Sequence, residues 1–296
     1  TSYSGNITVT PTYLDLAGNP LSTLSGATDF EIDNTPPAAF QTGDVIPMGS
    51  LPKTRWFNAG TDSLRITIPI QTTDNSLLQG KIQPRMQITT VDGSLSDLGS
   101  STILTNIAVP VKEIFVKKAD IRSSFSATDF AQGVILLTNV DLYDRVGNVT
   151  VGSISLDTLV VDTISPVLGS YVAGISGSVA VLDTTLVSSD LLYARWTRFV
   201  DNSLLGESGV ADYEWAVGRF GSADLDSVQA WTSAGLDTFF TGEAPLRDST
   251  RYDLSVRSVD SAGNASGALK TASGFYRLNS APVVSTIDTV FTKEQV

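Results

Sequence analysis

The feature of this sequence that most constrains its fold is a five-residue pattern, Asp-x-x-Gly-Asn, that occurs three times. The copies begin at Asp15 (DLAGN), Asp144 (DRVGN) and Asp260 (DSAGN), and the first two lie 129 positions apart. The same offset separates Asp33 in FEIDNTPP from Asp162 in LVVDTISP, and each of these is followed four positions later by proline. A repeat of this length is a domain and not one turn of a solenoid. We therefore expect a chain of similar domains.

Apolar residues alternate with polar ones ahead of each copy, as at Tyr252, Leu254 and Val256 before Asp260. A period of two over this length predicts a half-buried strand. The aspartate carboxylate can accept hydrogen bonds from the backbone N–H groups that follow it, and Gly and Asn tolerate the positive φ of a tight turn. The pattern is therefore predicted to be the turn between the last two strands of each domain, with a proline-marked exit after the second strand.

The composition excludes several functional classes. A net charge of -12, with no basic run longer than Lys117-Lys118, argues against a nucleic-acid or anionic-membrane surface and favours cations as small partners. Cysteine and histidine are absent, which excludes disulfides, thiolate zinc sites and a Ser-His-Asp triad. No phosphate-loop, nucleophile-elbow or zinc-protease motif occurs, so we expect no enzyme and no catalytic or cofactor-binding residue. The uncharged window 165–182 is interrupted by proline, glycine and serine, and it is not expected to span a membrane.

Residues 38–166, with GDVIPMGS, WFNAGTDSLRITIPI, DNSLLQGKIQ and LVVDTISP, resemble the bacterial immunoglobulin-like repeats of giant surface proteins, and residues 5–37 resemble the tail of such a repeat. The next segment resembles a fibronectin type III module in YARWTRFVD, VADYEWAVG and PLRDSTRYDLSVRSVDSAGN. This resemblance implies that Trp196, Tyr213 and Trp215 are core aromatics. It also implies that Tyr252 is a corner tyrosine whose hydroxyl bonds back to the backbone near Leu246.

We therefore predict an all-β fold of tandem immunoglobulin-like and fibronectin III-like β-sandwiches. Residues 1–37 are expected to be the C-terminal strands of a truncated immunoglobulin-like domain, and residues 38–165 a complete bacterial immunoglobulin-like domain. Residues 166–282 are expected to form a fibronectin III-like or immunoglobulin-like domain, and residues 283–296 to start a further domain.

Oxygen-bearing side chains at the domain joints are candidate calcium ligands, because Ca²⁺ prefers carboxylate and amide oxygens and a bound cation would stiffen an acidic array. The candidates are Asp33, Asn34, Asp144 and Asp162. The competing interpretation is that Asp144 caps its turn, while Asp33 and Asp162 only lead out of the last strand. No EF-hand loop is present, and the two alternating aspartates of SADLDS are also explained by an edge turn.

The resemblance implies a structural role: a spacer or stalk segment of a giant extracellular bacterial surface protein such as an adhesin, a surface fibre or a surface layer. The expected partners are neighbouring domains of the same chain, with self-association or a surface glycan or protein ligand also open. The alternative is a glycan-binding or accessory module of a larger secreted enzyme. The aromatic residues proposed for glycan binding are Trp56, Trp231, Phe239 and Phe240, although most aromatics in a sandwich belong to the core.

Overall fold

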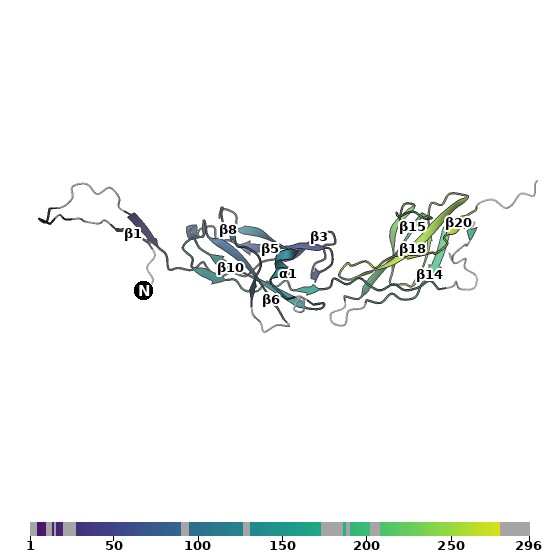
Figure 1. The fold of residues 1–296 in the computed structure, drawn as a ribbon, viewed down its shortest axis with the longest axis horizontal. Helices are drawn as coiled ribbons and strands as arrows, with labels where there is room; N and C mark the ends of the chain where they lie inside the picture. The colour runs from purple at the N-terminus through teal and green to yellow at the C-terminus, as the bar shows by residue number, and fades with distance from the viewer. Residues whose placement is uncertain are drawn as a thin grey trace, which may run out of the picture. The chain divides into compact units, whose positions relative to one another are not determined.

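The computed structural model describes residues 5–9, 14, 16–19, 28–89, 95–126, 131–172, 186–187, 190–201 and 208–278. The chain divides into two compact units, Thr1–Val161 and Asp162–Val296 (Figure 1). The predicted further domain at 283–296 and the first turn aspartate, Asp15, lie outside the described residues. No helix in the described part of the chain is long and apolar enough to cross a membrane.

The first unit contains an N-terminal ribbon and a β-sandwich. The ribbon pairs β1 (Gly5–Val9) with β2 (Thr28–Ile32) in antiparallel register. One sheet of the sandwich has the order β4 (Trp56–Phe57), β12 (Leu159–Val161), β10 (Ile135–Tyr143), β6 (Lys81–Ile88) and β7 (Ser96–Asp97), with β11 (Val149–Val151) paired to β10 and β8 (Thr102–Ile103) paired to β6. The other sheet contains β3 (Val45–Gly49), β5 (Thr61–Pro69) and β9 (Val111–Lys117).

The core of the first unit comes from the alternation of its strands. Along β5, Leu64, Ile66 and Ile68 are fully buried while the residues between them are partly exposed. Leu136 and Val140 of β10 belong to the same core cluster. Each such side chain contributes about 1.5–3 kcal/mol when buried. A 3-10 turn, η1 (Asn75–Leu77), and a short helix, α1 (Lys118–Ser123), complete the unit, and α1 lies beside β5 (Figure 1).

The second unit is also a sandwich of two sheets. Its large sheet has the order β13 (Leu186–Val187), β20 (Phe275–Arg277), β18 (Thr250–Asp260), β15 (Val210–Arg219) and β16 (Gln229–Gly235), with β19 (Leu269–Lys270) paired to β18. Its small sheet pairs β14 (Leu191–Arg195) with β17 (Phe239–Glu243). The long strands β15 and β18 run side by side in Figure 1.

Aromatic rings fill the core of the second unit, as the resemblance to a fibronectin type III module implied. Tyr213 lies edge-on to both Trp196 and Phe199, at centroid distances of 5.6 and 5.5 Å. The hydroxyl of Tyr252 accepts a hydrogen bond from the backbone N–H of Arg247 at 2.7 Å, which confirms the predicted corner tyrosine. The chain is therefore an all-β protein built from tandem immunoglobulin-like and fibronectin III-like sandwiches, as predicted.

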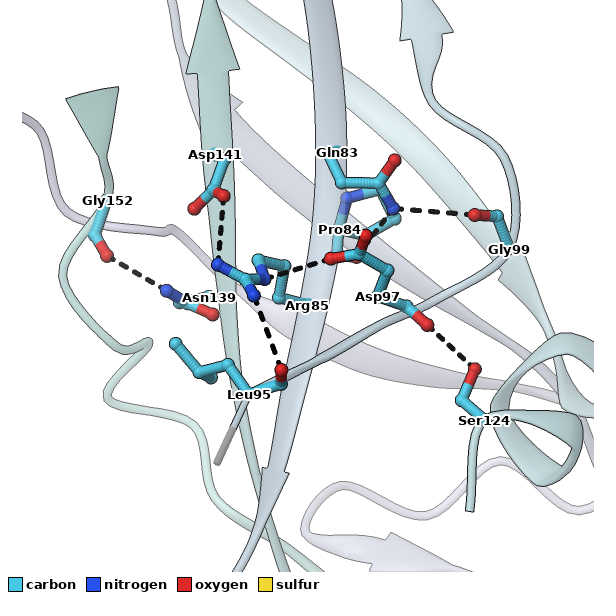
Figure 2. A network of polar contacts seen from close by, with 10 residues as sticks. All are labelled: Gln83, Pro84, Arg85, Leu95, Asp97, Gly99, Ser124, Asn139, Asp141 and Gly152. Carbon is cyan, nitrogen blue, oxygen red and sulfur yellow. Dashed lines mark hydrogen bonds and ion pairs between the residues drawn. The ribbon is translucent and has the colours of Figure 1, made fainter. Parts of the chain in front are cut away.

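One charged network lies on the outer face of the large sheet of the first unit (Figure 2). The Arg85 guanidinium on β6 reaches Asp141 Oδ2 on β10 at 3.1 Å, Asp97 Oδ1 on β7 at 3.0 Å and the carbonyl of Leu95 at 3.3 Å. Asp141 is almost completely buried, and burial raises its pKa above the ordinary value although Arg85 acts in the opposite direction. Arg85 therefore ties three strands together and compensates a buried carboxylate.

We predict that Arg85→Met lowers the unfolding free energy of the first unit by roughly 2–4 kcal/mol at pH 7, because it leaves the Asp141 charge buried without its partner. The pKa of Asp141 in the folded state is raised above its unfolded value of 3.8, so the folded state binds this proton more tightly than the unfolded state. The stabilisation from this proton is complete below pH 3.8 and is lost as the pH rises through the folded pKa. The deficit of the variant should therefore shrink towards pH 4. Urea unfolding followed by the NMR signals of the β6 and β10 amides measures it.

The control is Arg65→Met, which breaks the exposed ion pair of Arg65 with Glu113 and should cost less than about 1 kcal/mol. A deficit for Arg85→Met that is equally large at pH 4 and pH 7 would contradict the assignment to Asp141.

Candidate functional site

The repeated pattern folds as a turn whose aspartate carboxylate collects the backbone donors of the turn. Asp144 Oδ1 accepts hydrogen bonds from the N–H groups of Val146, Gly147 and Asn148 at 3.0, 2.7 and 2.9 Å. Gly147 has φ +103°, a conformation that glycine adopts without strain. The turn interpretation of Asp144 is confirmed. One detail was wrong: the turn joins β10 to the short strand β11, and the last strand, β12, comes later.

The second unit repeats the same geometry. Asp260 Oδ1 accepts from the N–H of Asn264 at 2.8 Å, and the N–H of Gly263, which has φ +91°, donates to the Asp260 carbonyl. In both units the backbone N–H of the aspartate also donates to the carbonyl of the asparagine, at 3.0 Å for Asp144 and 3.1 Å for Asp260. The two turns are therefore copies in structure as well as in sequence.

The asparagine side chain makes this turn a clasp for the incoming chain. Asn148 Nδ2 donates to Asp144 Oδ2 at 2.7 Å and to the backbone carbonyl of Asp33 at 2.8 Å. Asn264 Nδ2 donates to Asp260 Oδ2 at 2.9 Å and to the carbonyl of Asp162 at 3.0 Å. An amide nitrogen has two hydrogens, and each asparagine divides them between its turn and a linker carbonyl. We call this arrangement, in each unit, the linker clasp.

The linker clasp attaches each linker to the domain that follows it in the chain. Asp33 directly follows β2, and Asp162 directly follows β12. The Asn264 amide also reaches the carbonyl of Ile164 at 3.3 Å, so residues 162–164 are bonded into the second unit. Sequence analysis identified these aspartates as a repeated pair but did not identify the asparagine as the residue that connects them. The signal in the sequence was the offset of 129 positions, which the linker aspartates share with the first two turn aspartates.

Three of the four predicted calcium candidates lie outside the cluster of three carboxylates that the described residues contain. Asp33 Oδ1 accepts from the N–H of Thr35 at 2.9 Å, and Asn34 is exposed. The Asp144 carboxylate is occupied by the donors of its own turn. Calcium binding by these three residues stays a prediction.

The fourth candidate, Asp162, lies in a cluster with Asp201 and Asp260. All three are buried, and their nearest carboxylate oxygens lie within 4.8 Å of one another. Asp162 Oδ2 accepts from the N–H of Ser208 at 3.2 Å, and Asp201 Oδ2 accepts from the N–H of Gly209 at 2.7 Å. The 208–209 segment therefore holds two of the carboxylates in place. Asp201 was missed from the sequence because it has no motif of its own.

The electrostatics of this carboxylate cluster are unfavourable when all three groups are ionised. Burial raises the pKa of Asp260 to about 6, and the negative charges of Asp162 and Asp201 act in the same direction. The hydrogen bonds from Asn264 oppose the shift. A proton or a hard cation would relieve the repulsion between the three carboxylates. All of the potential ligand atoms in the cluster are oxygens, which are the ligands that Ca²⁺ prefers.

The four aromatic residues proposed for glycan binding have different local environments. Trp56 lies half-buried on β4, and the guanidinium of Arg257 covers the ring of Trp231 at 4.1 Å. Phe240 is buried and stacks on Trp215 at a centroid distance of 4.3 Å, while the neighbouring Phe239 is exposed. Glycan binding stays a prediction without a defined surface among the described residues.

No protein-family model matches the sequence, and no curated protein is significantly similar to it. The solved structure of chicken CNTN1 FN1-FN3 domains is similar at 15% identity and a TM-score of 0.40, covering 82% of this chain and 66% of that chain. Clostridium thermocellum CbhA fibronectin(III)-like modules are similar at 11% identity and a TM-score of 0.39, covering 76% of this chain and 90% of that chain. Because both TM-scores are low, the description of the fold depends on the strand pairing and cores given above.

We predict that Asn264→Ala destabilises the second unit, and Asn148→Ala the first, by about 1–3 kcal/mol each, because each leaves a buried carboxylate oxygen and a linker carbonyl without their donor. Native-state hydrogen exchange at the amides of β18 and β10 separates the two units. Asn106→Ala is the control, since Asn106 is exposed and only caps the N–H of Ala108. Equal effects of all three variants would contradict a special role for the clasps.

Proposed function

We propose that this chain is a structural spacer of an extracellular surface protein, in which each domain binds the linker that enters it. The observation that carries the proposal is the linker clasp, present with the same hydrogen bonds in both units: Asn148 on the carbonyl of Asp33 and Asn264 on that of Asp162. Such a device suits a spacer, because the stiffness of a spacer depends on its joints.

Hydrogen bonds hold the chain on both sides of the boundary between the two units. The backbone N–H of Val161 donates to the carbonyl of Val134, which fixes β12 in the first unit. The carbonyl of the next residue, Asp162, is held by Asn264. Adjacent residues are thus bonded to different units. The proline after each linker aspartate, Pro37 or Pro166, adds a fixed φ to the same segment.

The absence of cysteine and the acidic net charge are both compatible with a chain of tandem domains. A chain of domains without cysteine cannot rely on disulfides, and its net charge of -12 disfavours dense association with other acidic surfaces. The partners that we propose are therefore neighbouring domains of the same chain, outside the cell and at its surface. The accessory role in a secreted enzyme is the alternative, and it would use the same joints for a different purpose.

We predict that Asn264→Ala increases the range of distances between the two units. Small-angle scattering of the wild-type chain and of the variant measures this range as the width of the distribution of interatomic distances. The distribution should broaden for Asn264→Ala and stay unchanged for the exposed control, Asn106→Ala. Identical distributions for wild type and Asn264→Ala would show that the clasp does not stiffen the joint and would remove the support for a spacer.

We also propose that the carboxylate cluster of Asp162, Asp201 and Asp260 binds calcium. Asp162 is both a cluster member and the residue whose carbonyl the clasp holds, so an ion there would reinforce the same joint. The support is the burial of three carboxylates within 4.8 Å and the raised pKa of Asp260, which both indicate a need for a positive charge.

We predict that millimolar calcium raises the melting temperature of the second unit relative to chelator, because a ligand of the native state stabilises it by about 2.7 kcal/mol at a hundredfold excess over Kd. Asp201→Asn should remove the contribution of this cluster to the rise. Asp237→Asn, at an exposed aspartate, is the control. A rise of the same size in wild type and Asp201→Asn would show that the ion binds elsewhere.

A further inference from the structure

A second group of buried oxygens lies on the outer face of the large sheet of the second unit. Asp253 on β18 stands opposite Gly218 on β15, and Ser255 stands opposite Ala216. These side chains face away from the aromatic core, because the core contains the alternate residues of both strands. Gly218 and Ala216 leave little side chain on their half of this surface, so the backbone of a covering loop can approach the sheet there.

Both oxygen-bearing side chains are buried and incompletely bonded. Asp253 is 5% exposed and Ser255 is 0% exposed. Neither Asp253 Oδ1 nor Ser255 Oγ has a hydrogen-bond partner. Leaving a buried polar atom unpaired is costly, and two on neighbouring positions of one strand face require an explanation.

The loop between β15 and β16 covers this surface with more oxygen atoms. A Cβ atom on Gly218 would lie 2.7 Å from the carbonyl oxygen of Asp224 and 2.9 Å from that of Leu225, so both carbonyls approach the sheet directly at the glycine. The N–H of Gly221 donates to Asp253 Oδ2 at 3.2 Å, which ties the loop to the carboxylate. The carboxylates of Asp224 and Asp226 lie close to each other in the same loop.

The nearby arginines on this face of β18 have partners elsewhere. The Arg251 guanidinium stacks on Phe220 at 3.5 Å and donates to the carbonyl of Ser273. Arg257 Nε pairs with Glu214 at 2.7 Å. No positive side chain is therefore paired with Asp253 among the ion pairs of the described residues.

We propose that Asp253, Ser255 and the loop carbonyls of Asp224 and Leu225 form a divalent-cation site, with Ca²⁺ as its ion. The donors are a carboxylate, a hydroxyl and two carbonyls, all hard oxygens, and Ca²⁺ accepts six to eight such ligands with water completing its shell. The unpaired Asp253 Oδ1 supplies the negative charge, and the loop carboxylates raise the local concentration of cations. The site shares no residue with the carboxylate cluster, so it goes beyond the proposed function and does not depend on it.

The ion would explain the loop as well as the oxygens. The start of the loop is bonded to β18 through the N–H groups of Phe220 and Gly221, and a ligand that joins β18 to residues 224–225 would also fix the middle of the loop on the sheet. It also explains the glycine at position 218, because a side chain there would displace both carbonyls.

The test is a calcium titration of the full chain, followed by the NMR shifts of the backbone amides of Gly218, Gly221 and Leu225. We expect saturable shifts at millimolar calcium or below, the range of extracellular calcium modules. Ser255→Ala should weaken the apparent affinity about tenfold, and Asp253→Asn should abolish the shifts at these amides. Shifts at Ser208 and Gly209 report the carboxylate cluster separately.

The matched control is Ser258→Ala, which removes another fully buried, unpartnered hydroxyl of β18, on the opposite face of the strand. It should leave the calcium shifts of the loop unchanged. Because Asp253→Asn can also unfold the unit, Ser255→Ala is the decisive variant. No shift at these amides at ~10 mM calcium would overturn the proposal. Shifts that Ser255→Ala leaves unaltered would overturn it too, since they would assign the ion to the exposed loop carboxylates alone.

Discussion

The organisation of this chain depends on one interaction, the hydrogen bond from an asparagine amide to the backbone carbonyl of an incoming linker. Asn148 and Asn264 each use one N–H to close a turn and the other to hold a linker aspartate. The turn aspartate positions the amide, and the glycine before it permits the positive φ that brings the asparagine into place. A local turn motif therefore acts on a residue more than a hundred positions away, and it does so in both units.

The same motif lies in two different electrostatic settings. In the first unit the linker carboxylate of Asp33 accepts from Thr35, and the turn carboxylate of Asp144 is satisfied by its own turn. In the second unit Asp162 meets Asp260, and Asp201 brings a third charge to the same place. The pKa of Asp260 is raised to about 6 as a result of burial and these neighbours. The repeated turn is structural in both cases, and among the described residues only the second one lies in a cluster of three buried carboxylates.

The sequence was sufficient for the parts of this structure that follow local rules. Strand periodicity, the turn chemistry of Asp144 and the corner hydroxyl of Tyr252 depend on residues close together in the chain, and the structure confirms them. The asparagine contact, the approach of Asp201 and the buried oxygens of Asp253 and Ser255 depend on which strands pair and which faces are covered. No local pattern encodes those choices, because they are made by the packing of the whole sandwich.

The central claim is that residues 162–164 belong mechanically to the second unit, and backbone ¹⁵N relaxation measures this directly. In the wild-type chain the order parameters of these amides should equal those of β15 and β18, near ~0.85, and in Asn264→Ala they should fall towards those of a loop. Low order parameters at these linker amides in the wild type, or values that Asn264→Ala leaves unchanged, would contradict the account.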